Sequence, residues 1–193
     1  MNLLAAIIRQ EIDSAGPISF ARFMDLALYH PVHGYYEGAG SPIGRRGDFH
    51  TSVSVGGLFG ELLAFQFAEW LQPEHVAGSP TGEAVCGALP LCQILEAGSH
   101  DGQLALDVLT FLAVQRPALL ARLEYWVIEP SAQRRQQQQV TLRPFTPKVR
   151  WFRAWEELPA EGVRGVIFSN ELLDAMPVMR LGWDATARDW FEW

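Results

Sequence analysis

The sequence has 193 residues, of which 49% are hydrophobic and 19% charged, and these proportions are typical of a globular protein. Its formal net charge of −7 argues against a nucleic-acid partner, because proteins that bind nucleic acids present a basic surface. Two cysteines, Cys86 and Cys92, and an N-terminus without the basic start of a signal peptide predict a cytoplasmic protein. No apolar run approaches the ~18 residues of a transmembrane helix, so we expect no membrane partner.

The N-terminal region, residues 1–71, has the pattern of helices separated by glycine-rich loop. The first helix is expected behind an Asn2 cap. Ser19 is expected to cap the second helix, which should end near Tyr29 because Pro31 disfavours helix at His30. A third helix is expected over 56–71. Its predicted apolar side consists of Leu58, Phe59, Leu62, Leu63 and Phe67.

Residues 72–90 are rich in Pro, Gly, Ser and Thr and are interpreted as a connection. From 91 to 193 short apolar strands alternate with helices, which is typical of right-handed βαβ units in a parallel sheet. The sequence therefore predicts an α/β, Rossmann-like domain after a helical extension. The expected strands are 91–95, 124–128, 149–152 and 163–169, the last of them apolar enough for the middle of a sheet.

A glycine-containing turn follows the first expected strand and contains Glu96, Gly98 and Gly102. Glycines let the backbone approach a ligand closely at such a turn. A dinucleotide fingerprint would need further glycines where His100 and Gln103 stand, which disfavours a nicotinamide-dependent oxidoreductase. The looser E-x-G-x-x-x-G pattern of methyltransferase loops is satisfied, and an ordinary strand-to-helix turn is the alternative.

Acidic and amide side chains follow two other expected strands. Glu129, after the second strand, is suited to accept hydrogen bonds from the two hydroxyls of a ribose, and a solvated acid is the alternative. Asn170, Glu171 and Asp174 follow the fourth strand, where they could contact a cofactor, hold a cation or orient a nucleophile. For Asp174, a helix-capping role is an equal alternative. The histidines and cysteines form no zinc-binding pattern, so we expect no metal.

Taken together, several segments resemble the MidA family of S-adenosylmethionine (SAM)-dependent methyltransferases, which includes the mitochondrial complex I assembly factor. The resemblance covers almost the whole chain. It rests on the segments ALYHPVHGYY, IGRRGDFHTS, LEAGSHDGQLALDVL, VIEPSAQRRQQQ and NELLDAMPV.

The resemblance implies a class I methyltransferase fold with SAM as cofactor and a protein arginine as methyl acceptor. Glu96, Gly98 and Gly102 match the family's SAM loop, and Glu129 matches its ribose-binding acid. The family's loop that closes over the cofactor corresponds to Asp48, Phe49, Thr51 and Ser52. The motif that faces the acceptor corresponds to Asn170, Glu171 and Asp174.

The chain departs from the family pattern in two ways. The middle glycine of the family's SAM loop is His100 here, and family members continue well beyond Trp193. We therefore expect a sheet that lacks its later strands and has an unpaired edge. A non-catalytic assembly module on this fold is the alternative function. The methyl acceptor and the oligomeric state stay open at this point.

Overall fold

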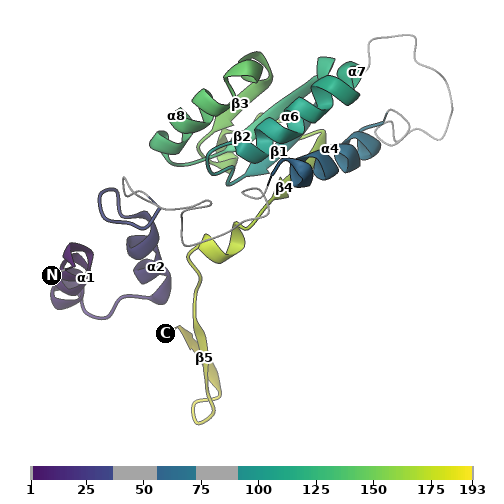
Figure 1. Ribbon diagram of the computed structural model, residues 1–193. Coiled ribbons are helices and arrows are strands. Elements are labelled where there is room, and N and C mark those ends of the chain that lie inside the picture. The colour runs from purple at the N-terminus through teal and green to yellow at the C-terminus, as the bar shows by residue number, and fades with distance from the viewer. Residues whose placement is uncertain (1, 37–55, 73–90, 193) are drawn as a thin grey trace. The chain divides into compact units, whose positions relative to one another are not determined.

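The computed structural model describes residues 2–36, 56–72 and 91–192 (Figure 1). These residues form two compact units: one combines 2–36 with 171–192, and the other combines 56–72 with 91–170. The predicted cofactor-covering residues Asp48, Phe49, Thr51 and Ser52 lie outside the described residues. The division into an extension at 1–71, a connection at 72–90 and a domain at 91–193 stays a prediction.

The first unit begins with the helices α1 (Leu3–Ala15) and α2 (Phe20–Tyr29). Both predicted caps are confirmed: Asn2 Oδ1 accepts from the amide of Leu4 at 3.0 Å, and Ser19 Oγ accepts from the amide of Arg22 at 3.2 Å. Helix α2 ends before His30, as the proline that follows it predicts.

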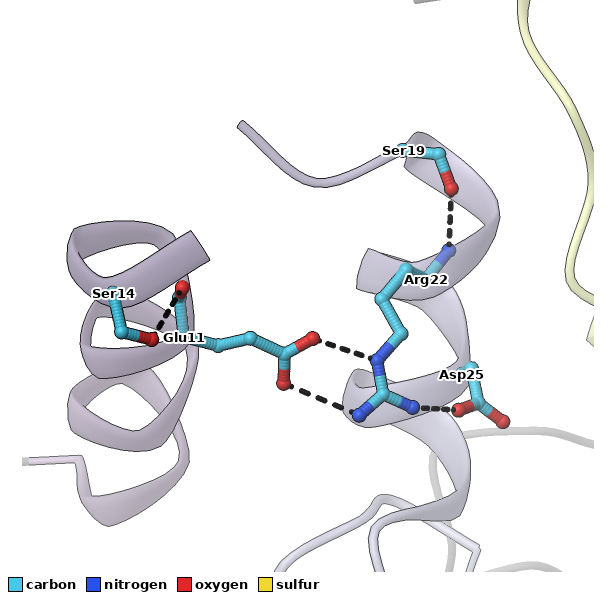
Figure 2. Close-up of polar contacts among 5 residues, drawn as sticks. All are labelled: Glu11, Ser14, Ser19, Arg22 and Asp25. Atoms are coloured by element: carbon cyan, nitrogen blue, oxygen red, sulfur yellow. Dashed lines mark hydrogen bonds and ion pairs between the residues drawn. The ribbon is translucent and has the colours of Figure 1, made fainter. Parts of the chain in front are cut away.

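Arg22 joins α1 to α2 through a bidentate ion pair. Its Nε and Nη2 donate to the two carboxylate oxygens of Glu11 at 2.8 and 3.2 Å, and its Nη1 donates to Asp25 at 2.6 Å (Figure 2). The hydrogen bonds from Arg22 lower the pKa of Glu11. Because these side chains are exposed to solvent, the pair orients the two helices more than it stabilises them.

The C-terminal segment of this unit is anchored on α2. The Tyr29 hydroxyl donates to the carbonyl of Ala175 at 2.6 Å, and the Arg180 guanidinium lies 5.1 Å from the centre of the Phe20 ring. An antiparallel hairpin follows, formed by β5 (Leu181–Asp184) and β6 (Asp189–Glu192). This hairpin was not predicted from the sequence. Its two tryptophans are more than half exposed, and their ring centroids are 5.3 Å apart.

The second unit contains a parallel sheet of strand order β3-β2-β1-β4. Its strands are β1 (Cys92–Ala97), β2 (Leu123–Ile128), β3 (Val149–Phe152) and β4 (Gly165–Ser169). Its helices are α4 (Leu58–Trp70), α6 (Gln103–Gln115), α7 (Pro117–Ala121) and α8 (Ala132–Thr141), with 3₁₀ turns at Arg143–Lys148 and Trp155–Glu157. Parallel strands joined by helices confirm the predicted α/β architecture.

Helices α4 and α6 pack against each other over one face of the sheet (Figure 1). The expected apolar side of α4 is only partly right, because Leu58 and Leu62 are 67% and 60% exposed. The buried side is instead built from small residues and one aromatic residue: Gly60, Ala64, Phe67 and Ala68. Small side chains are needed there because the two helices approach closely.

Gly60 lies where α4 approaches α6 closely, and replacing it should weaken the packing of the two helices. A Cβ at Gly60 would lie 2.5 Å from the Cβ of Asp107 on α6. We expect Gly60→Ala to lower the free energy of unfolding by about 1–2 kcal/mol, because overpacking outweighs the gain in helix propensity. At Gly57 the added Cβ would make an ordinary 3.6 Å contact with the same aspartate. Urea unfolding should show a smaller loss for Gly57→Ala, and equal losses would contradict the packing argument.

Strand β4 corrects another expectation from the sequence. It lies at the edge of the described sheet rather than in its middle, and Ile167 is 56% exposed. In the described residues no strand pairs with the outer side of β4. None of the helices in the described residues has the length and apolar character needed to cross a membrane.

Candidate functional site

The candidate site lies where three parallel strands of the second unit end together. Ala97 at the end of β1 pairs with Ile128 of β2 and with Ser169 of β4. The amide of Gly98 donates to the Ile128 carbonyl at 3.2 Å. The residues that follow these strands are therefore brought to one edge, where open α/β sheets bind their ligands.

Left-handed backbone shapes the loop between β1 and α6. The φ angle is +77° at Gly98, +46° at His100 and +84° at Gly102. The Gly102 amide donates to the Ser99 carbonyl at 2.7 Å, which closes the turn. A Cβ at Gly102 would lie 3.4 Å from the Cα of Gln138. A side chain at Gly102 would therefore strain the backbone and would also press against the neighbouring helix.

His100 stands where the family resemblance implies a glycine. Its φ of +46° lies in the left-handed region, which costs an L-residue about 1–2 kcal/mol. The imidazole is 40% exposed, and its Nδ1 lies 3.6 Å from Asp101 Oδ1. The neighbouring His100 imidazole is the main cause that lowers the pKa of Asp101. The loop thus keeps a glycine-like backbone while it carries an exposed imidazole.

Glu96 is a buried acid near the end of β1, with 2% of its surface exposed. Ser99 Oγ and the Tyr125 hydroxyl donate to its Oε2 at 2.7 and 2.8 Å. Burial raises the pKa of Glu96 to about 7, although these two hydrogen bonds oppose the shift. Glu96 therefore anchors the turn that contains Gly98, and its contact with a cofactor stays a prediction.

Glu129 is the second buried acid at this edge and is 5% exposed, so the alternative of a solvated acid is wrong. Its Oε1 accepts from the Ser131 amide at 3.0 Å, and its Oε2 accepts from Gln138 Nε2 at 3.2 Å. Its own amide donates to the Phe152 carbonyl at the end of β3. These contacts orient the carboxylate, and each oxygen of a carboxylate can accept more than one hydrogen bond.

Gln138 was not predicted as a site residue from the sequence, in which it is one of four consecutive glutamines at 136–139. The side chain is fully buried in the second unit and contacts both the loop after β1 and Glu129. The only signal in the sequence was its spacing of four residues from Leu142, which is also fully buried.

The three predicted acceptor-facing residues are divided between the two units. Asn170 directly follows β4 and belongs to the second unit, whereas Glu171 and Asp174 belong to the first. Glu171 has a φ of +49° and is exposed, and Asp174 is exposed in the 3₁₀ turn Leu173–Ala175. The side chain of Asp174 caps no helix in the described residues. The roles of all three stay predictions.

In the described residues, histidine, cysteine and acidic side chains form no cluster able to hold a metal ion. A glycine-rich turn after β1 and a buried acid after β2 are the features by which Rossmann-like domains bind nucleotide-type cofactors. Fold and site together place the chain in the class of Rossmann-like cofactor-binding domains.

A family model described as "Putative S-adenosyl-L-methionine-dependent methyltransferase" matches residues 62–193, and the chain belongs to this family. The mitochondrial protein arginine methyltransferase NDUFAF7 homolog of Drosophila melanogaster is 31% identical over 92% of this chain and 41% of the relative. Its counterpart from Mus musculus is 28% identical over 94% of this chain and 43% of the relative. The chain therefore spans less than half the length of these relatives.

A solved structure shows the same fold. A candidate methyl transferase from Burkholderia thailandensis bound to S-adenosyl-homocysteine (SAH) superposes with a TM-score of 0.74 at 36% identity, covering 98% of this chain and 45% of that one. These comparisons confirm the predicted family and the Rossmann-like methyltransferase fold. The expectation of a cytoplasmic protein is wrong, because the curated relatives from fly, mouse and cattle are named mitochondrial.

Proposed function

We propose that this chain is the cofactor-binding part of a SAM-dependent methyltransferase whose acceptor is a protein arginine side chain. The observation that carries the proposal is the pairing of the left-handed turn Gly98–Gly102 with the buried acid Glu129 at one sheet edge. The family description names SAM as the cofactor of its members, and the relatives from fly and mouse are named as protein arginine methyltransferases.

The chemistry of the site fits such a cofactor. Glu129 accepts from the Ser131 amide and from Gln138 Nε2, and an acid at this place after a strand is the group that binds ribose hydroxyls in Rossmann-like folds. At Gly98 the backbone carries no side chain that would block the approach of a ligand. When bound, SAM supplies an electrophilic methyl group, and the residues of this chain bind and orient it.

The proposed acceptor-binding residues are Asn170, Glu171 and Asp174. They follow β4 in the chain, and β4 ends beside β1 at the edge that carries the glycine turn. Carboxylates are the natural partners of a guanidinium group, which they bind by paired, charge-assisted hydrogen bonds. Glu171 and Asp174 would therefore hold the arginine. The alternative of a non-catalytic assembly module gains no support from the relatives, which are named as methyltransferases.

Calorimetric titration of the purified chain with SAM, SAH and NAD tests this proposal. We expect micromolar binding of SAM and SAH and no binding of NAD. Glu129→Ala should weaken SAH binding at least tenfold, because each hydrogen bond to a charged group contributes about 1.5–3 kcal/mol.

The matched control is Glu156→Ala, which removes an exposed acid from the same unit and should leave the affinity unchanged. A folded chain that binds neither SAM nor SAH would contradict the proposal. Equal loss in the Glu129 and Glu156 variants would contradict the role assigned to Glu129.

A further inference from the structure

Gln138 differs from the other glutamines of its run. Residues 136–139 are four consecutive glutamines on α8, and Gln138 is the member with no exposed surface. Gln136, Gln137 and Gln139 are exposed. Burying an amide is unfavourable unless its hydrogen bonds are satisfied, so the environment of Gln138 must supply partners.

Three partners satisfy the Gln138 amide. Its Nε2 donates to the His100 carbonyl at 2.9 Å and to Glu129 Oε2 at 3.2 Å. Its Oε1 accepts from Trp151 Nε1 at 3.1 Å. Both amide hydrogens are therefore in use. The opposite orientation of the amide would bring oxygen against two acceptors, so these contacts fix which way it points.

The contacts of Gln138 connect three strands. His100 lies in the turn after β1, Glu129 follows β2, and Trp151 is part of β3. The backbone of α8 also lies close to the turn: a Cβ added at Gly102 would be only 3.4 Å from the Cα of Gln138. One side chain thus holds both parts of the candidate cofactor site at a fixed separation.

We propose that Gln138 is a positioning residue for cofactor binding. Its amide orients the Glu129 carboxylate toward the ribose hydroxyls and holds the turn at His100 next to that carboxylate. This inference rests on the proposed function. Gln138 itself uses both donors within the protein, so it acts through Glu129 and the turn rather than on the ligand. Its effect should therefore be specific to the part of the ligand that Glu129 recognises.

The test compares SAH with its 2′-deoxy analogue by calorimetry. The wild-type chain should prefer SAH at least tenfold, because the analogue lacks one hydroxyl that donates to a carboxylate. Gln138→Met, which keeps the length of the side chain but removes its donors, should reduce this preference to less than threefold. The control Gln137→Met makes the same change at an exposed position of α8 and should keep the wild-type preference.

Trp151→Phe provides a second variant in case Gln138→Met does not fold. It removes the donor to Gln138 Oε1 while it keeps an aromatic ring, and it should also lower the preference for SAH. If either variant binds both ligands more weakly by the same factor and keeps the wild-type preference, Gln138 has only a structural role and the inference is overturned. If the wild-type chain binds no SAH, the proposed function fails and the inference falls with it.

Discussion

Replacing Glu96 by glutamine is expected to remove a large pH dependence of stability. Burial raises the pKa of Glu96 from an ordinary value of 4.5 to about 7. Between these two values the unfolded chain loses the proton while the folded chain keeps it, so stability falls as the pH rises. The stabilisation from this carboxyl is fully present below pH 4.5 and is lost as the pH rises from there through about 7. A shift of this size corresponds to about 3 kcal/mol.

Urea unfolding of the wild-type and Glu96→Gln chains from pH 4.5 to 8 measures this effect. Glutamine keeps an oxygen that accepts from Ser99 and Tyr125, but it cannot ionise. The variant should therefore gain stability relative to the wild type as the pH rises, by about 3 kcal/mol over the range. Parallel pH profiles for the two chains would show that Glu96 does not titrate near pH 7.

Gly165→Ala is expected to separate β4 from β1. Gly165 begins β4 with a φ of +154°, and a Cβ there would lie 2.0 Å from the carbonyl oxygen of Gln93. Two hydrogen bonds hold the strands together at this point: the Gln93 amide donates to the Arg164 carbonyl, and the Arg164 amide donates to Gln93 Oε1. Neither backbone can yield without breaking them. We expect a loss of at least about 3 kcal/mol in the free energy of unfolding, from backbone strain and overpacking combined.

Gly162→Ala is the matched control for this substitution. Gly162 has a φ of +72°, also in the left-handed region, but a Cβ added there would meet no atom within 4 Å. Its replacement should cost only the backbone strain, about 1–2 kcal/mol. Equal losses in the two variants would mean that β4 tolerates a side chain at Gly165. Because Asn170 follows β4, Gly165→Ala should also displace this proposed acceptor-binding residue.

Features set by local chemistry could be predicted from the sequence. Asn2 and Ser19 cap their helices as expected, because a short polar side chain before a helix can accept a hydrogen bond from an unpaired amide of the first turn. The third strand was predicted at its observed bounds, and the turn from Gly98 to Gly102 lies between β1 and α6 as expected. Short apolar runs bounded by turn residues define such elements without any tertiary information.

Features set by contacts between distant segments could not be predicted. The buried side of α4 depends on the close approach of α6 at Gly60, which the apolar periodicity of α4 does not contain. The role of Gln138 depends on the turn after β1 and on Glu129, which lie 38 and 9 positions away in the sequence. A composition-based interpretation of the glutamine run could not distinguish its buried member from the exposed ones.

The candidate site was predicted in part. The sequence identified Glu96 and Glu129 from their places after apolar strands, and the structure shows that both are buried at the same sheet edge. It did not predict that each acid also holds its own loop, through Ser99 and Ser131. Those contacts depend on side-chain geometry, which the spacing of residues does not define.

A crystal structure of this chain with SAH tests the central claim most directly. Our account predicts that the ligand lies over the turn Gly98–Gly102, with its two ribose hydroxyls within hydrogen-bonding distance of the Glu129 carboxylate. Gln138 should keep its contacts with His100 and Glu129 in the complex. SAH bound elsewhere on the chain, or bound with its ribose away from Glu129, would contradict the account.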